Sequence, residues 1–307
     1  MGPYFSGIHH VGLTVADPVQ AQAFLSLSAQ FAPWSAAGQI DFGADSTLLC
    51  NVNGGLLLQS ATTTHDPVRR PVCEAGITHV CLQTPGIDSV HSAMFAGGGS
   101  FHCDPIDLGT GYLYCYARDP EFNVIEIEGV AAVWQDTSPW LAHVNIATAN
   151  LDRLIDFYAA LLGQTGVRSP RLRADPRLDA IADLPNVQLR MAWLQAGNMQ
   201  IELMQYLEPA TTQVTGRRVA GQPGYSHIAF EVIDLSRAVA HVQALGGRVN
   251  EGQPDAWRAL CQDPDGNAIW LLDLAGAGQQ SASLQALREP FINQRFQSAR
   301  AALPITQ

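Results

Sequence analysis

Four stretches of the sequence repeat one pattern, in which a histidine is followed by an alternating apolar run. They read GIHHVGLTV, GITHVCLQT, WLAHVNIAT and GYSHIAFEV, and their shared histidines are His10, His79, His143 and His227. Alternation of this kind predicts a β-strand, with the histidine near its start. Imidazole is a frequent metal ligand, but one histidine on an apolar strand is more often a hydrogen-bonded core residue. A metal site therefore needs a second type of ligand on a neighbouring strand.

Glu126 offers that second type of ligand. It lies in the run NVIEIEG, between Ile125 and Ile127. Successive side chains of a strand point to opposite faces, so the carboxylate lies on one face and both isoleucines on the other. A carboxylate in an apolar strand is costly to bury unless it is paired or bound to a cation. Glu126 is therefore predicted to face inward as a metal ligand.

The elements around these residues repeat as four modules. Each histidine strand precedes a predicted helix, over 17–31, 87–98, 150–163 and 234–247. In the last two helices, apolar residues recur at steps of three and four, and a glycine follows the final turn. Short strands come next, including two hairpins that share a D-P-x-x-N turn, at 115–129 and 259–273. Each module is thus predicted as strand–helix–strand–strand–strand.

The modules predict two domains and a tail. Residues 1–130 would form the first module pair and residues 140–275 the second. Residues 276–307 would form a polar tail that is partly helical, around 281–303. Pro290 should interrupt or kink that helix, because proline cannot donate the backbone hydrogen bond of a helix interior.

Composition narrows the classes of partner. The chain has 307 residues, is 47% hydrophobic and carries a formal net charge of -11 without any run of Lys or Arg. Such a chain is a poor ligand for a phosphate backbone, so we expect no nucleic-acid partner. No apolar stretch has membrane-spanning length, and none of the six cysteines forms a C-x-x-C pair. We therefore expect a cytoplasmic protein with reduced thiols and no membrane partner. A homo-oligomer is compatible with the sequence.

The four modules resemble the vicinal oxygen chelate superfamily, which includes glyoxalases, methylmalonyl-CoA epimerases, fosfomycin-resistance proteins and type I extradiol dioxygenases. The likeness spans about residues 7–275, over which four modules agree in order and register. It implies an α+β fold in which the four βαβββ modules pair into two cupped-sheet domains. In that superfamily a cupped sheet holds a divalent metal, with ligands from the first and last strands of the modules.

Pairing of neighbouring modules would place one metal site in the N-terminal half. Its ligands would be His10, His79 and Glu126, a two-histidine, one-carboxylate set that suits Fe(II) and leaves coordination positions open. Mn(II), Ni(II), Co(II) or Zn(II) serve elsewhere in the superfamily. Gln59, which aligns with Glu202 of the third module, is either a fourth ligand or a polar wall. The connectors between modules are long enough for this pairing, and we adopt it.

The C-terminal half offers a second set of ligands, His143, Glu202 and His227. At the position that matches Glu126 it has Trp270, whose indole would fill the cup, so we expect this half to be degenerate. A different pairing, of the first module with the fourth and the second with the third, would gather four ligands in one complete site: His79, Glu126, His143 and Glu202. The sequence leaves that alternative open.

The strand YLYCYAR suggests a reaction. If the D-P-x-x-N turn pairs Arg118 with Val124, Tyr116 lies directly across from Glu126. A tyrosine ten residues before the ligand glutamate, followed by D-P, is similar to the signature of the type I extradiol dioxygenases. That resemblance implies Tyr116 and His102 as the catalytic residues that flank the substrate. Two neighbours depart from the signature, Cys115 and Phe122.

The resemblance thus implies a metal-dependent, extradiol-type ring-cleaving dioxygenase acting on a small catechol-like aromatic. One alternative uses the same cup without O2, as a glyoxalase- or epimerase-like isomerase or lyase with a carbonyl substrate. Another is a non-catalytic protein of the resistance type, which binds a flat hydrophobic compound. The ligand set argues against this last reading, because such a protein needs no metal ligands.

Overall fold

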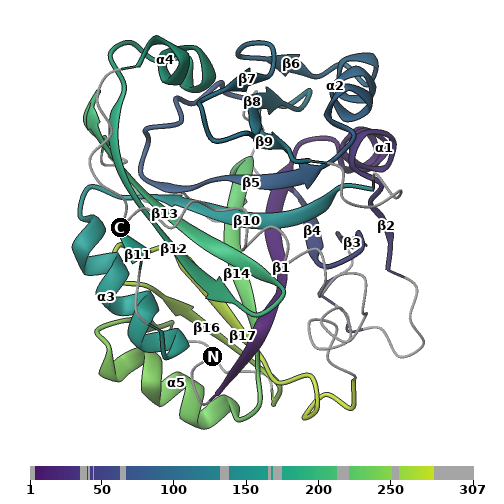
Figure 1. Ribbon diagram of the computed structural model, residues 1–307. Helices are drawn as coiled ribbons and strands as arrows, with labels where there is room; N and C mark the ends of the chain where they lie inside the picture. Colours follow the sequence, from purple (N-terminus) through teal and green to yellow (C-terminus); the bar gives the residue numbers. More distant parts are fainter. Residues whose placement is uncertain are drawn as a thin grey trace.

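The computed structural model describes residues 4–34, 40, 42–43, 45–62, 67–131, 138–164, 167–168, 175–212, 221–250 and 256–279. Within these residues the chain has the α+β fold that the sequence predicts, with four βαβββ modules paired into two cupped sheets. The sheets lie against each other, and helices cover their outer faces (Figure 1). The helix predicted around 281–303 lies outside the described residues.

The first sheet, called here the β1/β14 sheet, runs in the order β15-β16-β17-β14-β1-β4-β3-β2. Its strands are β1 (Phe5–Val15), β2 (Ala32–Pro33), β3 (Ser46–Cys50), β4 (Gly55–Ser60), β14 (Gly224–Val232), β15 (Arg248–Val249), β16 (Arg258–Gln262) and β17 (Ala268–Leu272).

The second sheet, called the β5/β10 sheet, runs in the order β11-β12-β13-β10-β5-β9-β8-β6, and β7 also pairs with β8. Its strands are β5 (Gly76–Thr84), β6 (Ser100–Phe101), β7 (Ile106–Asp107), β8 (Leu113–Arg118), β9 (Val124–Gly129), β10 (Trp140–Ala147), β11 (Val167–Arg168), β12 (Gln188–Ala196) and β13 (Met199–Glu208).

This strand order corrects the expected pairing of modules. β1 lies antiparallel to β14, and β5 lies antiparallel to β10. The first module therefore pairs with the fourth and the second with the third, so the expected pairing of neighbours is wrong. Residues 1–130 and 140–275 each contribute one module to each sheet.

One physical reason for this pairing is a close approach at Gly12. Gly12 of β1 lies opposite His227 of β14. A Cβ atom at Gly12 would come within 2.2 Å of the His227 ring, so only a glycine accommodates that imidazole. In the other sheet, Asn145 of β10 lies opposite His79 of β5. The choice of partner strand thus depends on the residue that faces each histidine, a small one at Gly12 and a polar one at Asn145.

Two buried asparagines join the sheets. Asn53, in the turn between β3 and β4, donates to the carbonyl of Leu141 at 2.8 Å and accepts from its N–H at 2.9 Å. Asn198, in the turn between β12 and β13, makes the same pair of bonds with Ile8, at 2.8 and 2.9 Å. Each amide also donates to the backbone carbonyl of the other asparagine. These bonds hold the two sheets in one relative orientation.

Four of the five described helices lie within the ranges that the sequence predicts. The five are α1 (Pro18–Ala29), α2 (Ile87–Ala96), α3 (Leu151–Leu162), α4 (Pro176–Ala182) and α5 (Leu235–Ala244). Asn150 caps α3 by accepting from the Arg153 N–H, and Gly163 ends it in the left-handed region, at φ 62°. The sequence did not predict α4, whose Ile181 and Ala182 pack on the apolar cluster around Tyr116.

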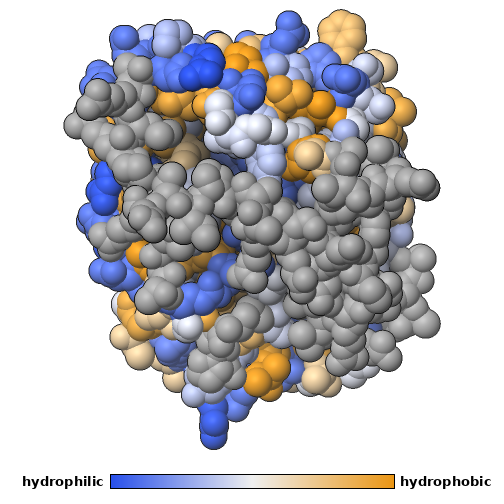
Figure 2. Space-filling view, in the orientation of Figure 1, coloured by the Kyte–Doolittle hydropathy of each residue, from blue (hydrophilic) through white to orange (hydrophobic). Residues whose placement is uncertain are grey.

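The described helices include none that is long and apolar enough to cross a membrane. Hydrophobic and hydrophilic residues are interspersed over the described part of the face drawn in Figure 2.

Candidate metal centre

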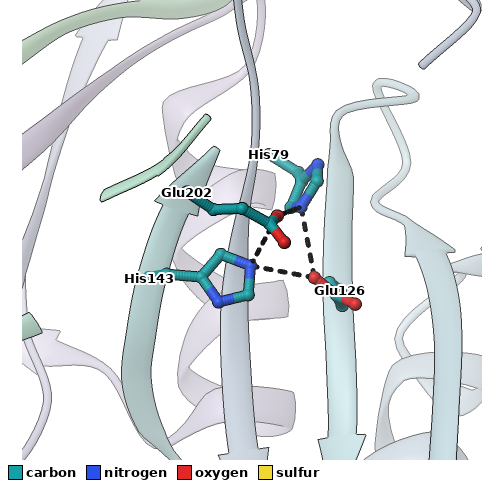
Figure 3. Close-up of side chains that lie close together, drawn as sticks. All are labelled: His79, Glu126, His143 and Glu202. Atoms are coloured by element: carbon teal, nitrogen blue, oxygen red, sulfur yellow. Dashed lines mark hydrogen bonds and ion pairs between the residues drawn. The ribbon is translucent and has the colours of Figure 1, made fainter. Parts of the chain in front are cut away.

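Two histidines and two glutamates converge on the inner face of the β5/β10 sheet (Figure 3). They come from four strands: His79 from β5, Glu126 from β9, His143 from β10 and Glu202 from β13. Their side chains each offer one ligand atom, and these atoms all lie within 4.8 Å of one another. All four residues are buried, with at most 7% of their surface exposed.

The distances between ligand atoms fit a single ion. The Nε2 atom of His143 lies 2.9 Å from Glu126 Oε2 and 3.3 Å from Glu202 Oε2. The Nε2 atom of His79 lies 3.2 and 3.7 Å from the same two oxygens. With metal–ligand bonds of about 2.1 Å, adjacent ligands at right angles lie about 3.0 Å apart. Two imidazoles and two carboxylates at this spacing therefore fit a divalent transition metal.

A chain of hydrogen bonds sets the tautomer of His79. The Thr78 hydroxyl donates to Asn145 Oδ1 at 2.6 Å and lies 2.9 Å from His79 Nδ1. Because the hydroxyl proton is used on Asn145, the Thr78 oxygen accepts from His79 Nδ1–H, which leaves Nε2 with a free lone pair. Asn145 Nδ2 in turn donates to Glu202 Oε2 at 2.9 Å. One chain of contacts thus orients two of the four ligands.

Cys81 supports the second histidine. Cys81 Sγ lies within 4.8 Å of a ring nitrogen of His143, and the Nε2 atom of His143 faces the two glutamates. Burial opposes a charge on His143, but Cys81, Glu202 and Glu126 raise its pKa well above the usual value. Burial would likewise raise the pKa of Glu126, yet the close contacts with the His143 and His79 imidazoles outweigh it and hold that pKa at about 2. Glu126 is therefore ionised, as a metal ligand must be.

His10 and His227, which the sequence suggested as ligands, lie in the other sheet. Their Nε2 atoms are 3.0 Å apart, and burial lowers the pKa of both, that of His227 to about 3. The two strand positions that carry glutamates in the β5/β10 sheet hold Leu57 and Trp270 here. The expected set of His10, His79 and Glu126 is thus not assembled, because its members belong to different sheets.

The expected alignment of Gln59 is also corrected. Leu57 pairs with Gly12 as Glu202 pairs with Asn145, so Leu57 occupies the equivalent position. Gln59 lies two residues further along β4, opposite Ser46 of β3. The alignment from sequence was displaced by one strand repeat of two residues, which preserves the alternation and therefore leaves no signal in the pattern.

Tyr116 lies where the sequence placed it, directly across from Glu126. Its ring is buried, with its centroid 4.9 Å from that of His79. Burial together with the Glu126 charge raises its pKa well above the usual value. Tyr116 is therefore a neutral phenol beside the ligand cluster.

The contacts of His102 differ from those of the substrate-flanking catalytic residue that the resemblance implied. Its Nδ1 donates to the Ile181 carbonyl at 2.8 Å, and its Nε2 accepts from Arg118 Nε at 2.8 Å. Burial lowers its pKa to about 4. With both nitrogens engaged in the fold, His102 positions Arg118 and has no free nitrogen for a substrate in this state.

Three polar residues beside the ligand cluster were missed by the sequence interpretation. Thr78 comes directly before His79, and Asn145 comes two residues after His143. Glu128 lies on the same face of β9 as Glu126. Glu128 accepts a hydrogen bond from Gln83, and burial and the Glu126 charge raise its pKa to about 7. The run I-E-I-E was a signal for Glu128, since both glutamates have the same parity.

Comparisons with known proteins agree with this architecture. Residues 140–271 match the family model of the Glyoxalase/Bleomycin resistance protein/Dioxygenase superfamily. Glyoxalase I from Zea mays superposes with a TM-score of 0.62 at 17% identity, covering 92% of this chain and 96% of that one. A protein described as "putative dioxygenase" from Bacillus subtilis subsp. subtilis str. 168 superposes with a TM-score of 0.60 at 12% identity, covering 97% and 96%. A search of curated proteins finds no match. Identities this low show a shared fold and leave the reaction to the site.

Proposed function

We propose that this protein, a member of the vicinal oxygen chelate superfamily, is a divalent-metal isomerase or lyase that moves a proton next to an oxygen-bearing carbon of a small substrate. The observation that carries the proposal is the size of the ligand set. Two histidines and two glutamates gather in one buried cluster, whereas the sequence suggested two histidines and one carboxylate.

The number of protein ligands distinguishes the two reactions that the sequence suggested. A six-coordinate metal with four protein ligands keeps two open positions, which suits a substrate that binds through two neighbouring oxygens. Ring cleavage of a catechol needs a third position for O2. The four-ligand set therefore favours proton transfer without O2 over ring cleavage.

A bound metal would supply Lewis-acid polarisation of the substrate oxygens and so acidify the adjacent C–H bond. The protein supplies the group that takes the proton. Glu202 is the more loosely held carboxylate, at 3.3 and 3.7 Å from the two histidines against 2.9 and 3.2 Å for Glu126. Asn145 donates a hydrogen bond to Oε2 of Glu202 and none to its Oε1. We assign Glu202 as the proton acceptor.

The test is exchange of the substrate C–H proton in D2O, followed by proton NMR on metal-loaded protein. The substrates are a panel of thiohemiacetals, acyl-CoA esters and α-hydroxy ketones. We expect exchange with at least one class and a loss on the order of 10²-fold in Glu202→Gln at saturating metal. Loaded wild-type protein that exchanges no proton in the panel and consumes O2 with catechols would overturn the assignment.

Ring cleavage is a second candidate because Tyr116 lies across from Glu126, as in the signature that the sequence resembles. A buried phenol at this position can hydrogen-bond an oxygen of the substrate. The distinguishing measurement is O2 uptake with substituted catechols by anaerobically Fe(II)-loaded protein. Uptake that depends on the Tyr116 hydroxyl would favour this candidate.

A further inference from the structure

A cavity of about 410 Å³ lies at one end of the β5/β10 sheet. Three segments distant in the sequence form its wall: residues 68–74 before β5, residues 118–124 around the β8–β9 turn, and residues 222–225 at the start of β14. None of the four candidate metal ligands lines it. Thr78, the neighbour of His79, does line it, so the cavity and the metal centre are adjacent.

Arg118 is the buried cation of this cavity, with only 2% of its surface exposed. It donates to His102 Nε2 at 2.8 Å and to the backbone carbonyls of Phe122 at 2.9 Å and Arg70 at 2.8 Å. These three acceptors are neutral, and among the described residues Arg118 forms no ion pair. A guanidinium has five N–H groups, so two of those of Arg118 have no acceptor among the described residues and can bind a ligand.

The acidic residues of the cavity do not neutralise Arg118, because each is bound elsewhere. Glu74 forms an ion pair with Arg70 at 2.8 Å. Both oxygens of Glu121 accept from the backbone N–H groups just before α1, at 2.7 and 2.8 Å. Burial lowers the pKa of Arg118 to about 10, which reflects the cost of holding this charge away from water. An anion in the cavity would offset that cost.

We propose that the cavity binds a small organic carboxylate, with the anionic group at Arg118 and the apolar body against Val72, Phe122 and Tyr225. A carboxylate can accept two parallel hydrogen bonds from a guanidinium, which gives the site its specificity for planar acids. The volume falls in the range of small-molecule pockets. The inference goes beyond the proposed function, because binding here uses none of the metal ligands.

The first test is calorimetric titration of EDTA-treated protein with benzoate and phenylacetate. Benzamide serves as the neutral isostere, and inorganic phosphate as the anion without an apolar body. We expect at least one acid to bind, with benzamide and phosphate at least tenfold weaker. Glu126→Gln, which removes a candidate metal ligand, should bind the acids unchanged. Equal binding of benzamide, equal binding of phosphate, or no binding of either acid would overturn the proposal.

Variants at the rim test the role of charge without disturbing the core. Val68 lines the cavity and is 61% exposed, so both Val68→Glu and Val68→Lys should fold. Val68→Glu should weaken acid binding about threefold to tenfold, because its carboxylate repels the bound anion, and Val68→Lys should strengthen it by attraction. Both effects are modest because solvent screens a charge at this exposed position. The matched control is Ile233→Glu, which is 66% exposed beyond the other end of β14.

Arg118→Met removes the charge and keeps most of the side-chain length, so it should abolish acid binding. Because it also removes three hydrogen bonds, its thermal unfolding is measured in parallel. If Arg118→Met unfolds, the acid affinities of Val68→Glu and Val68→Lys test the proposal in its place. Acid affinities that are equal in Val68→Glu and Val68→Lys would contradict the anion site.

Discussion

Trp270 lies flat against His227, with ring centroids 3.9 Å apart and an interplanar angle of 11°, at the strand position where Glu126 stands in the other sheet. Leu57 likewise replaces Glu202. The β1/β14 sheet therefore retains two histidines, without a carboxylate at either equivalent position. Stacking and hydrogen bonding account for those histidines, and the metal-binding capacity is expected in the β5/β10 sheet alone.

Metal content should separate the two sheets. Glu126→Gln and Glu202→Gln each remove an anionic ligand, so both should lower metal affinity by at least tenfold. His10→Gln should keep the wild-type metal content, because His10 lies in the other sheet. The measurement is elemental analysis after purification without a metal-binding tag. Loss of the metal in His10→Gln would instead support the ligand set predicted from the sequence, which includes His10.

The hydroxyl of Thr78 should tune metal affinity without being a ligand. Thr78→Ala frees the Nδ1 atom of His79, so its ring can rotate or change tautomer, and we expect a loss of about 10- to 100-fold in metal affinity. Ser226→Ala is the matched control, since Ser226 Oγ lies 3.0 Å from His227 Nδ1 in the same relationship. Affinities are measured by competition with a chromophoric chelator. Equal losses in the two variants would show a general effect on folding.

The Tyr116 hydroxyl should matter for turnover more than for stability. Tyr116→Phe keeps the buried ring and removes only the hydroxyl group, which should change the unfolding free energy by no more than about 1 kcal/mol. Turnover should fall on the order of 10²-fold if the phenol holds a developing oxyanion. The check is kcat in whichever assay the wild type supports, with metal content measured alongside. Unchanged kcat at full metal content would make Tyr116 a packing residue.

Acid should destabilise the fold through His227. Its pKa is lowered from 6.5 to about 3, chiefly by burial and further by the charge of Arg258. The unfolded chain therefore binds a proton below pH 6.5 that the folded chain does not take up until about pH 3. The unfolding free energy should fall as the pH drops through this range. His10, whose Nε2 lies 3.0 Å away, has its pKa lowered as well and adds to the effect.

His227→Phe isolates the contribution of this histidine. The phenyl ring can keep the stack on Trp270, but it cannot titrate. Denaturant unfolding between pH 6.5 and pH 4 should show a shallower loss of stability in His227→Phe than in wild type. Parallel curves for the two proteins would place the acid sensitivity elsewhere.

Much of the local architecture could be predicted from the sequence. The four modules, their histidine strands and the inward Glu126 follow from alternation, which is a property of a few consecutive residues. The pairing of Tyr116 with Glu126 also follows, because a short turn sets the register of a hairpin. Each of these features depends on residues close together in the chain.

Only the tertiary structure decided which histidines share a site. The four first strands have nearly the same pattern, so periodicity cannot tell whether β5 pairs with β1 or with β10. The choice depends on contacts between distant segments, such as Gly12 beneath the His227 ring and the bonds that Asn53 and Asn198 exchange between the sheets. Such contacts depend on the shapes and hydrogen-bond donors of individual side chains in three dimensions. For that reason the ligand set predicted from the sequence differs from the set that the structure brings together.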